Sequence, residues 1–367
     1  MTGERAATDR PSAPRAPRRR SGLALSPLTT MNDIAQMAGV SESTVSRALS
    51  GSPLVAHKTR ERILKLAQTA KYAVNEQARG LAMGLTRTIE VMFPIETGTL
   101  QRVSDPFFVD MLAVLTDALA ERGYDALLSK STPWSEVRPR CAFLGGRADG
   151  VIFVGQGRHP AEVRDFARAN RRVVTWGAVA EDSDHVVVGS DNVGGGYAAT
   201  KHMLDMGRKR IVFLGDRGLA EIRQRYDGYR MALRAAGLEV RDEFVVPAAF
   251  DIVEARTATA GLAELYPAFD AVFASSDMIA LAAIANLRAA GVDVPRDVSV
   301  VGFDDIAAGA HVHPSLTTVH QSIRRGGVKL VEKMMALLAG EDVGSETLST
   351  ELIVRESCGA PTSAGRP

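Results

Sequence analysis

The sequence predicts an α/β protein with a small helical headpiece at its N-terminal end and a two-lobed core of parallel sheets. Two patterns predict this organisation. Residues 30–50 carry apolar side chains at the spacing of two short helices, which a Gly-Val-Ser turn separates. From Thr88 onward, apolar runs of four to six residues alternate with amphipathic helical patterns, and the series restarts near Asp191. Continuous apolar strands separated by helices are typical of parallel sheets covered on both faces.

Charge is unevenly distributed along the 367 residues, although the net charge is only +1. Residues 1–87 hold 14 Lys and Arg against 6 Asp and Glu, whereas the remaining residues hold 30 against 37. A basic headpiece on an acidic body concentrates the field that attracts phosphates at one end of the chain. The distribution therefore favours a nucleic-acid partner for the headpiece alone.

The two ends of the chain are expected to lie outside the fold. Residues 1–28 are rich in Pro, Arg, Ser and Ala and predict a disordered basic tail, either simply solvated or adding phosphate contacts through its arginines. Residues 357–367 predict a flexible tail without leucine heptads, which favours a homodimer over a dimer of dimers. No segment has the apolar length of a secretory signal or a membrane span, so we expect no membrane partner and a cytoplasmic, nucleoid-associated protein.

The helices predicted within residues 30–50 have one apolar side and one polar side. Gly39 and small residues at Ala35 and Ala38 permit a close crossing of the two helices. The polar side of the second helix offers hydroxyls for phosphates, and a carboxylate and a guanidinium for base edges. An ordinary helical hairpin is the alternative interpretation. The apolar side consists of Ala35, Met37, Ala38, Val40, Val45, Ala48 and Leu49.

A third helix is predicted over Val55–Ala70, where Ile63, Leu64, Ala67 and Ala70 have the spacing of one helical face. A further short helical pattern runs from Asn75 to about Met83. The third helix would close a small core with the first two.

These segments resemble the headpiece of the lactose-repressor (LacI/GalR) family of bacterial transcriptional regulators. The family patterns D-[IV]-A-x-x-A-G-V-S-x-x-T-V-S-R, K-T-R and N-x-x-A-R-x-L are matched by residues 33–47, 58–60 and 75–81. The resemblance extends from about Thr29 to Glu356. Ser50 stands where the family usually has asparagine, and Ala56 where it usually has a serine that caps the third helix. Loss of that cap would cost about 1 kcal/mol.

The resemblance implies that the second helix enters the major groove of DNA. Glu42, Ser43 and Arg47 would contact bases, with Arg47 favouring guanine and Glu42 accepting from a cytosine amine. The residues expected to contact phosphates are Thr30, Ser41, Thr44, Ser46, Thr59 and Tyr72.

A hinge helix of about nine residues containing Gly80 and Gly84 is too short to be stable alone in water. We expect it to order when two copies meet on DNA and Leu81 enters a minor-groove base step, with Asn75, Ala78 and Arg79 beside it. Recognition would then require a homodimer and a near-palindromic operator. An effector that moves the two hinges apart would release the DNA.

The core elements follow in order. The strands of the first lobe are expected at residues 89–93, 124–128, 150–154, 172–176 and 185–190, with helices at 108–123 and 160–170. The strands of the second lobe are expected at 210–215, 244–247, 271–275 and 298–303, with helices at 195–207, 225–236, 253–265 and 278–291. The resemblance implies a periplasmic-binding-protein-like core with crossovers near Ser190 and Thr318, and a helix over Ile323–Leu338 that returns to the first lobe.

The expected domain boundaries follow from these elements. Residues 1–28 form the tail, 29–73 the headpiece, 74–87 the hinge helix and linker, and 88–356 the core. Within the core, the first lobe takes residues 88–189 and 319–340, and the second takes 190–318 and 341–356.

Ligands of such lobes bind at the carboxyl ends of parallel strands. Asp304 follows a predicted strand, and Arg225 matches the effector arginine of the family's R-x-x-G-[FYW] motif. The alternatives are a turn cap for Asp304 and a surface ion pair for Arg225. Ser276 occupies a small polar cleft position of the family. The aromatic candidates, each with core packing as its alternative, are Phe107, Phe108, Trp176 and Phe250.

An acid, an arginine, a small polar group and aromatic rings suit a polyhydroxylated ligand. We expect a sugar effector; a purine or another metabolite is the alternative.

The sequence has no G-x-S-x-G, H-E-x-x-H or GxxxxGK[ST] motif, and the triple glycine Gly194–Gly196 lacks dinucleotide-binding spacing. His311 and His313 have no further ligands in register, and Cys141 and Cys358 predict reduced thiols. We therefore expect no metal and no cofactor.

Together these patterns predict a repressor of carbohydrate-utilisation genes that a small sugar releases from DNA. A sugar-binding transport protein would account for the lobes but not for the headpiece. An enzyme has less support than either.

Overall fold

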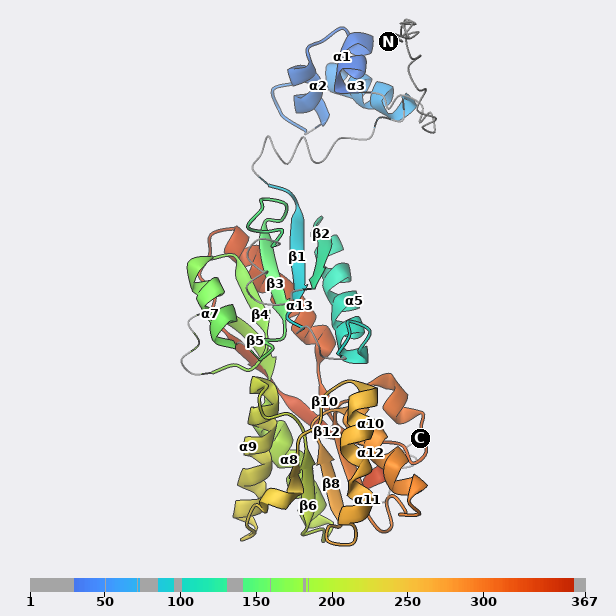
Figure 1. Ribbon diagram of the computed structural model, residues 1–367. Coiled ribbons are helices and arrows are strands. Elements are labelled where there is room, and N and C mark those ends of the chain that lie inside the picture. The colour runs from blue at the N-terminus through green and yellow to red at the C-terminus, as the bar shows by residue number, and fades with distance from the viewer. Residues whose placement is uncertain are drawn as a thin grey trace, which may run out of the picture. The chain divides into compact units, whose positions relative to one another are not determined.

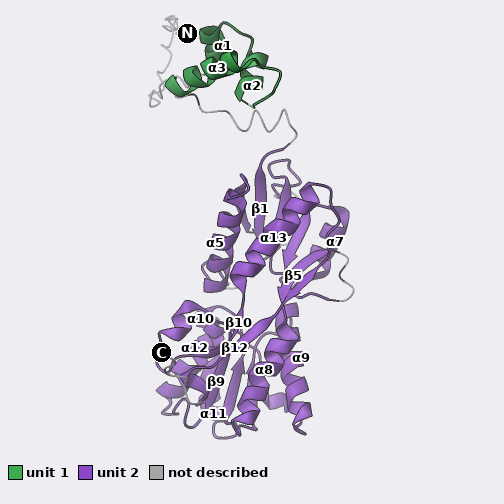
Figure 2. Cartoon of the chain, turned by 180° about the vertical axis from the view of Figure 1, so that it is seen from behind, with its two compact units in different colours: residues 1–79 green, residues 80–367 purple. Residues whose placement is uncertain are grey.

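The computed structural model describes residues 30–49, 51–70, 72, 85–95, 101–130, 141–158, 160–180, 183 and 185–359. The chain divides into two compact units, residues 1–79 and residues 80–367 (Figure 2). The expected basic tail, the hinge segment 73–84 and residues 360–367 lie outside the described residues.

The described residues of the first unit form three helices, α1 (Met31–Ala38), α2 (Glu42–Leu49) and α3 (His57–Thr69), which confirm the predicted headpiece. Their small core is built on Ile34, Val45 and Ile63, which are fully buried. Met37 and Leu64 were predicted on the apolar side but are 51% and 46% exposed. A core of this size is filled by the alanines and branched residues, so longer side chains at its margin stay in solvent.

The ends of these helices differ in how they are capped. At the start of α1, the Asp33 amide donates to Thr30 Oγ1 at 3.2 Å, and the Thr30 amide donates to the Asp33 carboxylate at 2.7 Å, forming a capping box. At the start of α3, Ala56 makes no side-chain cap, as its sequence predicts.

The first lobe of the second unit has a six-stranded parallel sheet in the order β11-β5-β4-β3-β1-β2. The bounds are β1 (Thr88–Phe93), β2 (Asp125–Lys130), β3 (Gly150–Val154), β4 (Val173–Trp176), β5 (Val186–Ser190) and β11 (Glu346–Leu348). Helices α5 (Pro106–Ala120) and α13 (Ile323–Leu338) cover one face, and α7 (Pro160–Ala169) covers the other (Figure 1).

The second lobe has a six-stranded sheet in the order β12-β10-β9-β8-β6-β7, in which only β12 is antiparallel to its neighbour. The bounds are β6 (Ile211–Leu214), β7 (Val245–Val246), β8 (Ala271–Ala274), β9 (Ser299–Asp304), β10 (Thr317–Gln321) and β12 (Thr350–Ile353). Helices α8 (Asn192–Asp205) and α9 (Ala220–Ala235) cover one face, and α10 (Ile252–Ala260), α11 (Leu262–Leu265) and α12 (Asp277–Ala289) cover the other (Figure 1). Three short 3-10 helices span Asp242–Phe244, Ala307–Ala310 and Glu356–Cys358.

Glycines bring α8 and α9 into close contact in the second lobe. A Cβ on Gly228 would lie 2.1 Å from the carbonyl oxygen of Val193, and one on Gly196 would lie 2.2 Å from that of Arg225. Part of the triple-glycine run of α8 therefore serves helix packing and fixes the backbone that carries Arg225.

The strand order corrects two of the expected lobe boundaries. β10, residues 317–321, pairs with β9 and belongs wholly to the second sheet, so the chain leaves that lobe after Gln321 rather than near Thr318. β11, residues 346–348, pairs with β5 in the first sheet, although residues 341–356 were assigned to the second lobe. The chain thus crosses between the lobes three times, with the third crossing between β11 and β12.

The expected flexible tail after Glu356 is also corrected at its beginning. Ser357 and Cys358 are buried, and Ser357 Oγ donates to the carbonyl of Val300 at 2.6 Å. Both cysteines are buried, and neither forms a disulfide. Burial raises the pKa of Cys141 to about 11, which keeps that thiol protonated at neutral pH.

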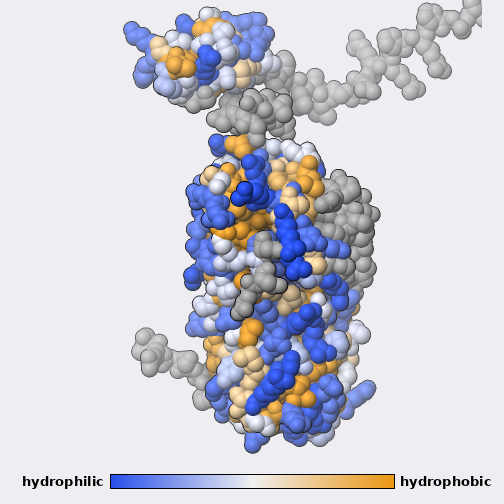
Figure 3. Space-filling model, turned by 90° about the vertical axis from the view of Figure 1, so that its left-hand side faces the viewer, coloured by the Kyte–Doolittle hydropathy of each residue, from blue (hydrophilic) through white to orange (hydrophobic). Residues whose placement is uncertain are grey.

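Among the described residues, no helix combines the length and the apolar character needed to cross a bilayer. On the face drawn in Figure 3, hydrophilic and hydrophobic side chains are interspersed rather than gathered in one continuous apolar belt.

Candidate functional site

The polar face of α2 is exposed, and its apolar face is buried in the headpiece core. Glu42, Ser43, Ser46 and Arg47 are exposed, while Val45 and Ala48 are buried. The division agrees with the sequence pattern: one face holds the helix in place, and the other presents a carboxylate, hydroxyls and a guanidinium to solvent.

Some hydroxyls expected to contact phosphates also have structural roles. Ser41 Oγ accepts from the Thr44 amide at 3.3 Å, so it caps α2, and it lies 2.9 Å from Ser43 Oγ and Thr44 Oγ1. Thr30 caps α1. Thr59 is half-buried in α3, and Tyr72 packs against the headpiece core. Asn75, Ala78, Arg79 and Leu81 lie outside the described residues.

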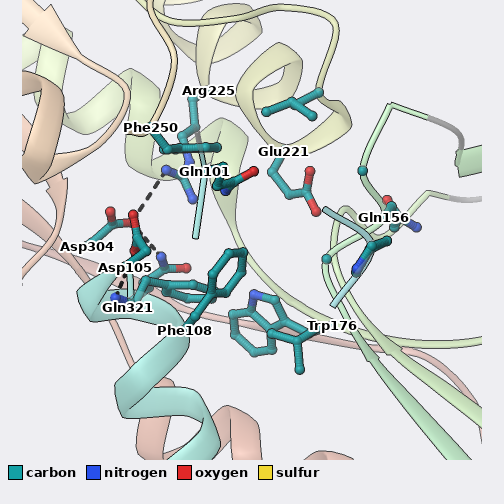
Figure 4. A pocket seen from close by; sticks show the side chains of 16 residues that line it. Gln101, Asp105, Phe108, Gln156, Trp176, Glu221, Arg225, Phe250, Asp304 and Gln321 are labelled. Carbon is teal, nitrogen blue, oxygen red and sulfur yellow. Dashed lines mark hydrogen bonds and ion pairs between the residues drawn. The ribbon is translucent and has the colours of Figure 1, made fainter. Parts of the chain in front are cut away.

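A pocket in the second unit lies between the two lobes (Figure 4). Six of the seven predicted effector residues line it: Phe107, Phe108, Trp176, Arg225, Phe250 and Asp304. Its other lining residues are Pro94, Gln101, Asp105, Val154, Gly155, Gln156, Gly157, Leu219, Glu221 and Gln321.

Arg225 extends from α9 toward the carboxyl end of β9. Its Nε donates to Asn192 Oδ1 at 2.9 Å, and its NH1 donates to the carbonyl of Ser275 at 2.5 Å. The guanidinium carbon lies 3.7 Å from the centre of the Phe303 ring. These contacts fix the guanidinium in a buried position, which corrects the alternative of a surface ion pair.

Asp304 is the last residue of β9. One of its carboxylate oxygens accepts hydrogen bonds from Arg225 NH1 at 3.5 Å and from Gln321 Nε2 at 2.7 Å. Its φ of 123° lies in a region that residues other than glycine rarely adopt. Burial raises its pKa above the ordinary value, and the charge of Arg225 opposes that rise. A strained, buried acid of this kind is typical of a binding site.

Four aromatic rings supply apolar surface to the pocket. Phe107 lies 5.7 Å from Phe108 and 6.2 Å from Trp176, measured between ring centres. Phe108 also packs edge-on against Phe93 at 5.0 Å. These rings therefore serve both the core of the first lobe and the pocket. Phe250 lines the pocket from the second lobe.

Ser276 does not line the pocket and is corrected as a candidate. Its side chain accepts from the amide of Ile279 at 3.3 Å and caps α12, where it is 1% exposed. Serine before an apolar helix is a common N-cap, so the local sequence accounts for it without a ligand.

Five polar lining residues were missed, and the sequence carried signals for three of them: Gln321, Glu221 and Asp105. Gln321 ends β10 beside Asp304, at the strand edge where ligands bind. Glu221 lies one helical turn before Arg225 on the same face of α9. Asp105 caps α5 by accepting from the Phe107 amide at 3.0 Å, and burial raises its pKa to about 6.

The pocket combines hydrogen-bonding side chains with flat apolar surface. Carboxylates, glutamine amides and a guanidinium can bind several hydroxyls, and aromatic rings suit either the C–H face of a sugar or a heterocyclic ring. Among the described residues, no group of three or more His, Cys, Asp and Glu side chains could hold a metal ion.

Two family models match the chain. The model of bacterial regulatory proteins of the lacI family matches residues 30–75, and the model of a periplasmic binding protein-like domain matches residues 200–358. The HTH-type transcriptional regulator CelR of Thermobifida fusca is 32% identical over 89% of this chain and 98% of its own length. The HTH-type transcriptional repressor PurR of Mannheimia succiniciproducens is 29% identical over 90% of this chain and 98% of its own length.

Solved structures agree with these matches. A complex of the transcriptional regulator CelR with cellobiose is 31% identical, with a TM-score of 0.67 over 89% of this chain and 99% of the other. The lac repressor dimer bound to operator and the anti-inducer ONPF has a TM-score of 0.80 at 22% identity, over 90% of this chain and 98% of the other. The latter likeness supports the fold alone.

Proposed function

Because this chain belongs to the lacI family of bacterial regulatory proteins and is a DNA-binding transcriptional regulator rather than an enzyme, we propose that it is a repressor released by a small sugar. The observation that carries the sugar effector is the buried cluster of Arg225, Asp304 and Gln321 beside the aromatic rings of the pocket. Hydroxyls of a sugar would bind the polar cluster while its C–H face packs on a ring.

The exposed polar face of α2 would read the operator in the major groove. Arg47 would bind guanine, Glu42 would accept from a cytosine amine, and Ser43 would contact a neighbouring base. Thr30, Ser41, Thr44, Ser46, Thr59 and Tyr72 would contact phosphates and position the headpiece.

Two copies would bind one near-palindromic operator in the cytoplasm, at the nucleoid. The segment containing Asn75, Ala78, Arg79 and Leu81 would form a hinge helix in each copy, and Leu81 would enter a minor-groove step. Its short length supports folding only on DNA. The pocket is lined from both lobes, so a bound sugar would favour one arrangement of the lobes and couple reciprocally to DNA affinity.

A purine effector is the second candidate, because a heterocycle also suits Arg225, Asp304 and the phenylalanines, and a relative at 29% identity is named PurR. The aromatic surface added by Trp176 and the relative solved with cellobiose favour a sugar.

Footprinting with the full chain on the genomic fragment beside its own gene tests the DNA function. We expect a protected, near-palindromic site that Arg47→Ala abolishes. A thermal-shift screen with monosaccharides, disaccharides and purines tests the effector, and we expect a sugar to raise Tm. Stabilisation by a purine alone would replace the sugar by the second candidate.

A further inference from the structure

Acidic residues outnumber basic residues in the lining of the pocket. Among its described lining residues, Asp105, Glu221 and Asp304 are acidic, and Arg225 alone is basic. Asp105 comes from the first lobe and the other two acids from the second, so carboxyl groups face the ligand from both sides.

The single basic group is already matched. Arg225 lies 3.5 Å from Asp304 and also donates to Asn192 and to the carbonyl of Ser275. An anionic ligand that bound Arg225 would therefore compete with Asp304 for it, inside a pocket where charges are poorly screened.

The start of α9 is the other feature that would attract an anion. A helix begins with unsatisfied amides and a partial positive charge. Here Glu221, in the first turn of α9, occupies that position with the chain's own carboxylate. Burial raises the pKa of Glu221, and hydrogen bonds from its own backbone amide and from the backbone of Gln156 in the first lobe, together with the charge of Arg225, oppose that rise and favour the ionised form. Figure 4 shows Glu221 and Gln156 facing each other at the opposite side of the pocket from Asp304.

On the basis of the proposed sugar effector, we propose that Glu221 makes the pocket selective for uncharged, hydroxyl-rich ligands and excludes acidic sugars such as uronic acids and sugar phosphates. Its carboxylate accepts hydroxyl hydrogen bonds and repels a second anion. The glutamine side chains Gln101, Gln156 and Gln321 line the same pocket and offer both donors and acceptors without charge.

Calorimetric titration of the full chain with matched probes tests this selectivity. The probes are glucose, glucuronate and glucose 6-phosphate; galactose, galacturonate and galactose 6-phosphate; and cellobiose. We expect each neutral sugar that binds to have a Kd about tenfold or more lower than that of its uronate or its phosphate. An acidic sugar that does not bind at all fits the same expectation. Glu221→Gln keeps the shape of the side chain and should reduce that ratio several-fold, because it frees the start of α9 for an anion. Glu239→Gln, a change at an exposed acid outside the pocket, should leave the ratio unchanged.

The outcomes separate this inference from the proposed function. Equal or tighter binding of a uronate or a sugar phosphate by the wild type would overturn the inference while leaving a sugar effector in place. Unchanged discrimination in a folded Glu221→Gln protein would also overturn it, and Glu221→Ala provides the same test if the glutamine variant fails to fold. Binding of no sugar at all would remove both the proposed effector and the inference.

Discussion

The carboxylate of Asp304 and the guanidinium of Arg225 lie 3.5 Å apart in the buried interior of the pocket, although β9 and α9 bring them from distant parts of the sequence. Gln321 binds the same carboxylate oxygen at 2.7 Å. The desolvation cost of burying two charged groups is offset only when the groups lie in good geometry and their remaining hydrogen bonds are satisfied. The pair is therefore a costly arrangement, which is expected where a ligand is bound.

Asp304→Asn should abolish the response to the sugar while leaving operator binding intact. The amide keeps the size of the side chain but loses the charge that faces Arg225, so ligand affinity should fall about tenfold or more. Titration calorimetry and operator binding by fluorescence anisotropy measure the two effects separately. Asp227→Asn, which removes a surface pair with Arg230, is the control. A wild-type sugar response in Asp304→Asn would remove Asp304 from the site.

Asp105→Asn should stabilise the protein at neutral pH but not in acid. Burial raises the pKa of Asp105 from 3.8 to about 6, so the folded protein holds this proton more tightly than the unfolded chain does. The cost of ionising the acid is absent below about pH 4, grows as pH rises to about 6, and is constant above. Asparagine also caps helices well, so the cap of α5 is kept.

The measurement is Tm of wild type and Asp105→Asn from about pH 4 to pH 8. Near pH 8 the variant should have a higher Tm than the wild type, equivalent to a gain of on the order of 1–3 kcal/mol in the free energy of unfolding. Near pH 4 the two Tm values should be equal. A pH-independent difference would show that the carboxyl has an ordinary pKa.

Ala56→Ser should stabilise the headpiece by about 1 kcal/mol, because Ala56 leaves the start of α3 without a side-chain cap. The extended backbone of this residue, with φ −55° and ψ 139°, accepts a serine. Hydrogen exchange in the full chain should show slower exchange of the amides in the first turns of α3. Unchanged protection would mean that another group already satisfies those amides.

Gly228→Ala should destabilise the second lobe by about 1–3 kcal/mol, since overpacking outweighs the better helix propensity of alanine. The new Cβ would lie 2.1 Å from the carbonyl oxygen of Val193. Gly261→Ala is a matched control, because a Cβ there meets nothing within 4 Å and its φ is −69°. Urea unfolding should separate the two variants, and equal midpoints would contradict the close crossing of α8 and α9.

The headpiece helices and most core elements could be predicted because their apolar periodicity is set locally. Lobe membership near the carboxyl end could not, because β11 and β12 are only three and four residues long and their partners, β5 and β10, are far away in the sequence. Periodicity also misplaced Met37 and Leu64, since the size of a core decides which members of an apolar face are buried.

The pocket residues could be predicted only in part, because some have a local sequence signal and others depend on the assembled fold. Arg225 and Asp304 carry recognisable local sequence, whereas Gln321 and Glu221 become visible only when strand ends and helix faces are assembled. The prediction that Ser276 contacts the effector was wrong, because a serine that caps a helix and a serine that lines a cleft cannot be distinguished from the local sequence.

Operator binding by the full chain, measured by fluorescence anisotropy with and without a saturating sugar identified by the thermal-shift screen, tests the central claim most directly. The account predicts that the sugar weakens operator binding by the wild type about tenfold or more and has no such effect on Asp304→Asn. Operator affinity that stays the same with the pocket filled would contradict it.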